Sequence, residues 1–174
     1  MKKLFITTIS IFFVLFCFSQ DFKYVGAAKC KMCHNSDEKG KQFGKWTDSK
    51  HSKAFETLKG PEAAKIAKEK NIADASTAPQ CLKCHSTAAA IAPELNAGIT
   101  QEEGVSCESC HGPGSSYKSL NIMKDQALSL QNGLILPSEQ VCIKCHNSES
   151  PNFKGFDFKT YSERIAHPNP NKAK

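Results

Sequence analysis

The chain has 174 residues, of which 40% are hydrophobic and 23% are charged, and its formal net charge is +6. This length fits one domain better than several. The positive excess does not by itself imply a nucleic-acid partner, because basic runs such as residues 65–70 are typical of the solvated face of a helix.

The N-terminus has the organisation of a secretory signal peptide. Residues 1–3 carry two lysines, and the apolar run that follows, residues 4–18, is shorter than a membrane span needs. Cleavage after Ser19 would release the mature chain. A lipid-modified Cys17 is one alternative, although the bulky Phe16 argues against cleavage before it. An uncleaved N-terminal anchor, which would bring membrane association, is the other.

The chain is thus divided into a signal peptide, residues 1–19, and one mature domain, residues 20–174. The domain opens with the pentapeptide Cys-x-x-Cys-His at residues 30–34, and residues 42–58 are predicted to be largely helical. A Gly-Pro step then starts a new helix, and residues 62–72 are rich in Ala, Lys and Glu, which predicts an amphipathic surface helix.

Three more pentapeptides of the same form follow at unequal intervals, at residues 81–85, 107–111 and 142–146. Pro79 predicts that the second begins a helix, and Gly-Pro-Gly at residues 112–114 turns the chain directly after the third. Residues 121–132 are predicted to form a helix closed by Gly133, and Ser138 is suited to cap the helix of the fourth. An open tail rich in Pro, Gly and aromatic residues follows.

Cys-x-x-Cys-His is the attachment signature of c-type heme. The two thiols form thioethers with the porphyrin vinyl groups, and the imidazole becomes the proximal ligand of the iron. The predicted attachment residues are Cys30, Cys33, Cys81, Cys84, Cys107, Cys110, Cys142 and Cys145, and the predicted proximal ligands are His34, His85, His111 and His146. Four covalently bound hemes c are expected, and in so short a chain the porphyrins must supply much of the apolar interior.

Other uses of the same cysteines explain the pattern less well. Two zinc sites could use the eight thiolates but would give no reason for the appended histidines. A thioredoxin-like redox pair needs one motif beside a βαβ pattern, and no such pattern is visible in the sequence. Disulfides would not require four identical pentapeptides. The expected fold is therefore mainly α with extensive loops, organised by its cofactors, with little or no β-structure.

Heme attachment also predicts the compartment. It is completed outside the cytoplasm, so a periplasmic location is expected. Loss of Lys2 and Lys3 with the signal peptide lowers the count of Lys and Arg from 23 to 21 against 17 acidic residues, which leaves a formal charge of +4. Eight heme propionates would outweigh this excess, so no nucleic-acid partner is expected.

The second axial ligand of each iron is scarce in this chain. Only His51 and His167 remain outside the motifs, so at most two hemes can have two histidine ligands. Met123 is the best-placed methionine, and core packing is its competing role. One iron would still lack an obvious ligand and could bind a small molecule, or be ligated by Tyr117, Tyr161 or a lysine.

Several segments of the chain form a distinctive combination: residues 29–34, Trp46, residues 51–55, 81–85, 104–114 and 142–146. In these segments the chain resembles the tetraheme cytochrome c-554 family. The resemblance implies hemes in stacked and near-perpendicular pairs, with three irons six-coordinate and the second, over His85, five-coordinate. It also implies that His51 and, at the C-terminus, His167 are distal ligands. The type member of the family carries electrons away from hydroxylamine oxidation.

The chain departs from this family in one respect. The family supplies a further distal histidine shortly after the Gly-Pro-Gly turn, and none occurs here between His111 and His146. Met123 is the best substitute on that segment. The tail is also shorter than the family's, which weakens the transfer of a hydroxylamine-oxidation partner.

Three functions are consistent with these observations, one of which is that of a subunit or docking module of a larger redox complex; the other two are more specific. The first is a periplasmic electron carrier between redox partner proteins, which needs no catalytic acid or base. The second is a protein or enzyme that binds a small ligand such as nitric oxide or hydroxylamine at an open iron. The shortage of axial ligands keeps the second alternative open.

Overall fold

The structure is a computed structural model that describes residues 22–168 and 170, and within these residues the chain forms helices and loops without a strand. Its α-helices are α1 Ala27–His34, α2 Gln42–Asp48, α3 Ala54–Thr57, α4 Pro61–Glu69, α5 Pro79–His85, α6 Thr87–Ala90, α7 Cys107–His111, α8 Leu120–Met123, α9 Gln126–Gln131, α10 Glu139–Cys142 and α11 Phe158–Ile165. Three 3-10 turns are η1 Asp37–Lys39, η2 Pro93–Leu95 and η3 Gln101–Glu103. The prediction of a mainly α fold is confirmed. The predicted signal peptide, residues 1–19, lies outside the described residues.

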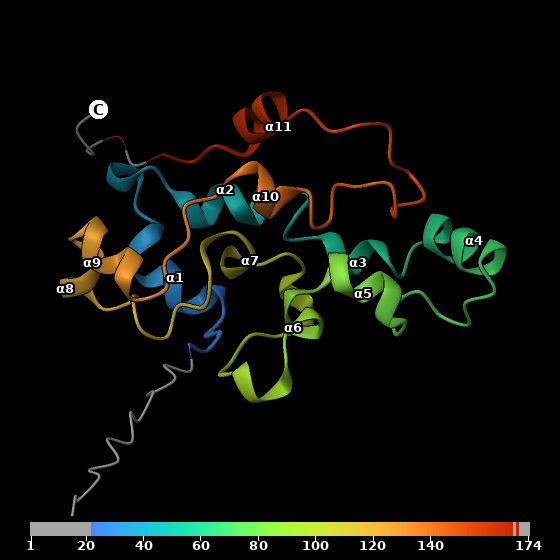
Figure 1. The fold of residues 1–174 in the computed structure, drawn as a ribbon, viewed down its shortest axis with the longest axis horizontal. Coiled ribbons are helices and arrows are strands. Elements are labelled where there is room, and N and C mark those ends of the chain that lie inside the picture. The colour runs from blue at the N-terminus through green and yellow to red at the C-terminus, as the bar shows by residue number, and fades with distance from the viewer. Residues whose placement is uncertain (1–21, 169, 171–174) are drawn as a thin grey trace, which may run out of the picture.

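The helices are arranged along one long axis (Figure 1). Helices α8 and α9 lie at one end and α4 at the other, with α1, α7, α10 and α5 between them. The C-terminal segment with α11 runs back along one side of this row. Extended backbone pairs at one point in the described residues, a parallel bridge between Tyr24 and Asn96.

Proline and glycine define several helix ends as the sequence predicted. Pro61 and Pro79 occupy the first turns of α4 and α5, where proline's missing N–H costs nothing. Gly112 ends α7 with a φ of 76°, and Gly133 follows α9 with a φ of 95°. Both angles lie in the left-handed region that glycine adopts at little cost.

Two predicted helices are broken because short polar side chains bind the backbone. Residues 42–58 form α2 and α3 rather than one helix. Between them the Ser49 hydroxyl donates to the Trp46 carbonyl and the Ser52 hydroxyl to the Thr47 carbonyl, which competes with helical hydrogen bonding. Residues 121–132 divide into α8 and α9 because the Asp125 side chain caps α9 by accepting a hydrogen bond from Leu128 N.

The C-terminal tail is not wholly open, because it contains α11. The Asp157 side chain caps this helix by accepting a hydrogen bond of 2.8 Å from Thr160 N. An aspartate followed by apolar residues at positions 158, 161 and 165 is a recognisable helix signal. That helix was therefore readable from the sequence.

The compact apolar core is small and lies toward one end of the molecule. It joins α3, α4 and α5 through Phe55, Leu58, Ala67, Ala75 and Leu82. Elsewhere many large apolar side chains are exposed. No helix among the described residues is both long and apolar enough to cross a membrane.

Candidate heme-binding site

Each Cys-x-x-Cys-His motif lies on a helical turn. The first three end α1, α5 and α7 with their histidines. The fourth begins at the end of α10 and continues as a turn in which His146 N donates to the Cys142 carbonyl at 3.0 Å. Residues at positions i, i+3 and i+4 of a helical turn share one face, so each turn presents two thiols and one imidazole together. None of the eight described cysteines forms a disulfide.

The third motif is bound to the start of α1 by two glutamates. Glu108, between the two cysteines of this motif, is 1% exposed, and its carboxylate accepts hydrogen bonds from the N–H groups of Val25, Gly26 and Gly114. Glu103 accepts a hydrogen bond of 2.9 Å from Ala27 N. We call these contacts the glutamate clamp. It satisfies N–H groups at the start of α1 that have no partner within the helix.

The clamp brings the first and third motifs together. The Cys30 and Cys107 thiols interact by a hydrogen bond, which lowers the pKa of Cys30 and raises the pKa of Cys107. Helices α1 and α7 are in contact. The shared cause of both pKa shifts is the short distance between thiols that are far apart in sequence.

The segment before the third motif is also bound to the segment around His51. Val105 N donates to the His51 carbonyl at 2.9 Å, and Trp46 Nε1 donates to the Val105 carbonyl at 2.9 Å. Gly104 lies directly against this backbone, because a Cβ atom at that position would be 2.7 Å from the His51 oxygen. The glycine therefore permits the close approach that fixes His51.

The fourth motif lies between the third and the second. Helix α10 contacts α7, and the negative charge of an ionised Cys142 contributes, after burial, to raising the pKa of Cys110. On the other side, burial and the neighbouring Cys84 thiol raise the pKa of Cys145 to about 12. In space the motifs therefore follow the order first, third, fourth, second.

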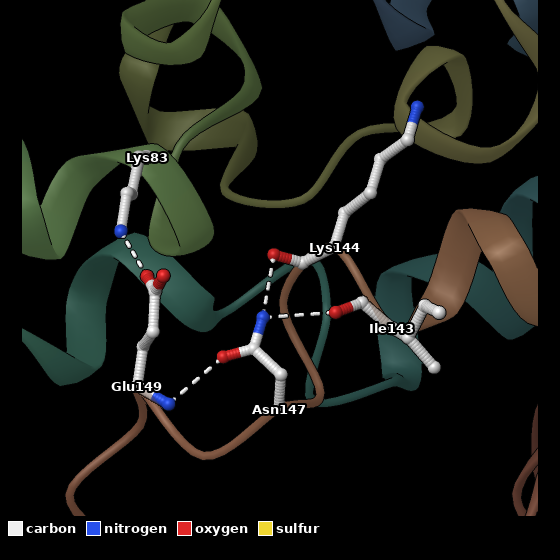
Figure 2. A network of polar contacts seen from close by, with 5 residues as sticks. All are labelled: Lys83, Ile143, Lys144, Asn147 and Glu149. Carbon is white, nitrogen blue, oxygen red and sulfur yellow. Dashed lines mark hydrogen bonds and ion pairs between the residues drawn. The ribbon is translucent and has the colours of Figure 1, made fainter.

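Figure 2 shows the polar contacts that join the second and fourth motifs. Lys83 of the second motif forms an ion pair with Glu149, just beyond the fourth. The Asn147 side chain donates to the Ile143 carbonyl at 2.8 Å and accepts from Glu149 N at 2.9 Å. Asn147 thus holds the turn of the fourth motif while Glu149 reaches across to the second.

Two pairs of imidazoles lie close together in T-shaped contacts. The rings of His51 and His146 have centres 6.0 Å apart and an interplanar angle of 82°, and those of His111 and His167 are 6.0 Å apart at 75°. Two metal–nitrogen bonds of about 2 Å on opposite sides of one metal hold imidazole centres about 6 Å apart. Each pair has the spacing of two ligands that share one iron.

Backbone carbonyls orient three of the imidazoles. The Nδ1 atoms lie 2.8 Å from the Ala54 oxygen for His85, 3.3 Å from the Ile135 oxygen for His111, and 2.7 Å from the Ile165 oxygen for His167. A carbonyl can only accept, so Nδ1 carries the proton in each ring and Nε2 has the lone pair for a metal.

Burial favours the neutral form of the imidazoles. It is the main cause that lowers the pKa of His34, His51, His111 and His146 below the ordinary histidine value. Neutral imidazole is the form that binds a metal.

The described residues do not give every motif histidine such a partner. Neither His34 nor His85 has a ring contact with another imidazole in the part of the chain that the structure describes. Met123 is half-buried on α8, where its backbone N donates to the Ser119 carbonyl. Its role as a ligand stays a prediction.

These residues fit heme c. Each motif offers a pair of thiols and an imidazole whose free nitrogen can bind iron. Exposed apolar side chains flank the motifs, among them Met32, Ile135, Ile143 and Phe153, and would pack against an apolar macrocycle. Sequence reasoning did not assign Glu103 or Glu108, although a glutamate between two heme cysteines was a visible signal.

Comparison with known proteins finds cytochromes that are similar in sequence. A family model described as cytochrome c554 and c-prime matches residues 29–112, which contain the first three motifs. Cytochrome c-554 of Nitrosomonas europaea is 31% identical over 157 residues, in an alignment that covers 78% of this chain and 63% of the relative. The chain thus spans less than two thirds of that relative's length. No solved structure matches the chain. The chain belongs to the cytochrome c-554 family, and covalently bound heme c is the cofactor that this membership implies.

Proposed function

We propose that the chain is an exported tetraheme cytochrome that transfers electrons between redox partner proteins in the periplasm. Its four motifs would attach four hemes c, which supply one-electron iron chemistry when bound. The observation that carries the proposal is the contiguous row of motifs in the order first, third, fourth, second, with an imidazole pair at each of the two central motifs.

The protein side chains would tune this row. His146 and His51 would ligate one iron and His111 and His167 another, with the motif histidine proximal in each pair. The Ile135 carbonyl, which accepts from His111, orients the ring and increases its basicity. The outer motifs, on α1 and α5, lie toward the two ends of the row (Figure 1). Partners that dock at the two ends could therefore deliver and remove electrons without competing.

Export would follow from the signal peptide proposed at residues 1–19. The reactive thiols of Cys30 and its counterparts must meet the attachment machinery before they pair with one another. N-terminal sequencing of the secreted protein tests this step, and an N-terminus at residue 20 is expected. An N-terminus that retains residue 1 would support the anchored alternative and membrane association.

A second function is favoured by one observation at His85. Its Nδ1 is bound to the Ala54 carbonyl and lies 3.3 Å from the Thr57 hydroxyl, so its Nε2 is oriented, yet it has no imidazole partner in the described residues. An iron on His85 would keep an open position. A small ligand such as nitric oxide or hydroxylamine could bind there, with the other three irons as its electron supply.

Three measurements test the proposal together. Intact mass should give four hemes per chain, and reductive titration should give four one-electron steps. His51→Ala and His167→Ala should each convert one low-spin iron to a high-spin iron by electron paramagnetic resonance. Low-spin signals unchanged in both variants would overturn the ligand assignment, and a heme count other than four would overturn the tetraheme proposal.

A further inference from the structure

The first motif, at the outer end of the row, differs from the two central motifs. All six histidines of the chain are described, and four of them form the two T-shaped pairs. The charge of His167 contributes to lowering the pKa of His34, and the charges of His167 and His34 contribute to lowering the pKa of His111. The three imidazoles are therefore near one another. His167, however, is paired with His111, whose imidazole is 6.0 Å away, so His34 has no second imidazole among the described residues.

The two tyrosines that were considered as ligands are engaged elsewhere. The Tyr117 hydroxyl is buried and donates to the Gly112 carbonyl at 2.7 Å. Tyr161 packs against the rings of His146 and Phe156 near the fourth motif. Neither tyrosine is available to the first motif.

The two methionines outside the proposed signal peptide lie on α1 and α8. Met32 lies between the cysteines of its own motif and is 81% exposed. Met123 belongs to α8, which packs on α9, and the Ser129 hydroxyl ties the two helices by donating to the Ile122 carbonyl at 2.9 Å. These contacts pack α8 against its neighbour in sequence.

The first motif is also accessible from solvent. Cys33 is exposed, whereas the other seven described cysteines are partly buried. A small solute can approach this end of the molecule without passing the other motifs.

The proximal side of the first motif has its own polar neighbour. Gln42 lies beside the His34 imidazole and acts to raise the pKa of that ring, against the larger lowering effect of burial. Its Nε2 donates to the Lys39 carbonyl, and its Oε1 is buried without a hydrogen-bond partner in the described residues. Such a buried acceptor is costly unless it receives an N–H, and the His34 ring can provide one.

We propose that the iron of the first motif, held by His34, is a second open centre that binds a small uncharged ligand of the class of carbon monoxide and nitric oxide. Gln42 is its positioning residue on the proximal side. This inference rests on the proposed tetraheme function. It adds a site at the opposite end of the row from His85, so both ends of the electron path carry an iron that can be approached by ligand.

Titration of the fully reduced holoprotein with carbon monoxide tests the number of open centres. With four hemes established by intact mass, two molecules of carbon monoxide should bind per chain. One or none would overturn the inference while leaving the tetraheme function intact, and a heme count other than four would overturn both. Met123→Ala should leave the number at two. A rise from one to two in that variant would assign Met123 as the ligand and overturn the open site.

Resonance Raman spectroscopy with matched variants assigns the two centres. Gln42→Leu should shift the iron–histidine stretching band of one open heme and change its carbon monoxide dissociation rate by about threefold or more. Thr57→Val, which alters the neighbour of His85, should affect only the other open heme. If Gln42→Leu leaves both bands unchanged, Gln42 has no positioning role, and if both variants shift the same band, the second open centre is not on His34.

Discussion

Replacement of Gly104 by alanine should detach His51 from its partner His146. Gly104 has φ 60° and ψ −128°, a conformation essentially restricted to glycine, and forcing another residue into it costs about 1–3 kcal/mol. The added Cβ atom would also meet backbone atoms at 2.7 Å from the His51 oxygen and 3.0 Å from the Ser52 oxygen. Backbone cannot rotate away as a side chain can, so the His51 segment must move.

The assay combines thermal unfolding with counting of low-spin iron. Gly104→Ala should lower the unfolding temperature and convert one iron from low-spin to high-spin. The matched control is Gly155→Ala, because Gly155 also has a positive φ, 97°, but an added Cβ atom there would meet nothing within 4 Å. The control should show the conformational cost alone, with every low-spin iron retained. Equal effects of the two variants on the iron would refute the reasoning.

Three further substitutions test contacts around the motifs. Glu108→Gln should destabilise the holoprotein by about 1–3 kcal/mol in denaturant unfolding, because one buried N–H of the clamp then faces an amide N–H₂ group and loses its acceptor. An unchanged free energy of unfolding would contradict the stabilising role of the clamp. Trp46→Phe removes the hydrogen bond to the Val105 carbonyl and should cost about 0.5–1.5 kcal/mol by the same measurement, and no loss would count against that bond. Lys83→Met should leave the unfolding temperature nearly unchanged, since the pair with Glu149 is solvent-exposed, and a large decrease would disprove this weak role.

Local helix signals were readable from the sequence where one residue type decides the backbone. Pro61 and Pro79 start their helices because the proline ring fixes φ and needs no partner for an N–H. The break after α2 was missed because Ser49 and Ser52 are compatible with a helix until their hydroxyls bind backbone carbonyls instead. Residue composition alone does not reveal whether the backbone stays helical or is bound by these hydroxyls.

Some features of the candidate site could likewise be predicted from the sequence, and others could not. The four pentapeptides predict attachment residues because the chemistry is local to five positions. Which distal histidine lies close to which motif depends on tertiary contacts, and His51 lies close to His146, 95 positions further along the chain as the printed numbering gives it. The spatial order of the motifs likewise depends on contacts such as those of Glu108, whose partners Val25 and Gly26 are distant in sequence.

The glutamate clamp also bears on how the chain matures during synthesis. Glu108 lies 83 positions after Val25, from whose N–H it accepts a hydrogen bond, so the first motif is synthesised before its clamp exists. We expect α1 to be undocked during this interval, with both of its thiols within reach of the attachment enzymes. Pulse-labelling of thiols on chains truncated before and after residue 108 checks this order, and equal reactivity of Cys33 in both would disprove it. The distance along the sequence between a helix and the carboxylate that anchors it would then act as a delay, giving the first heme time to be attached before the fold closes.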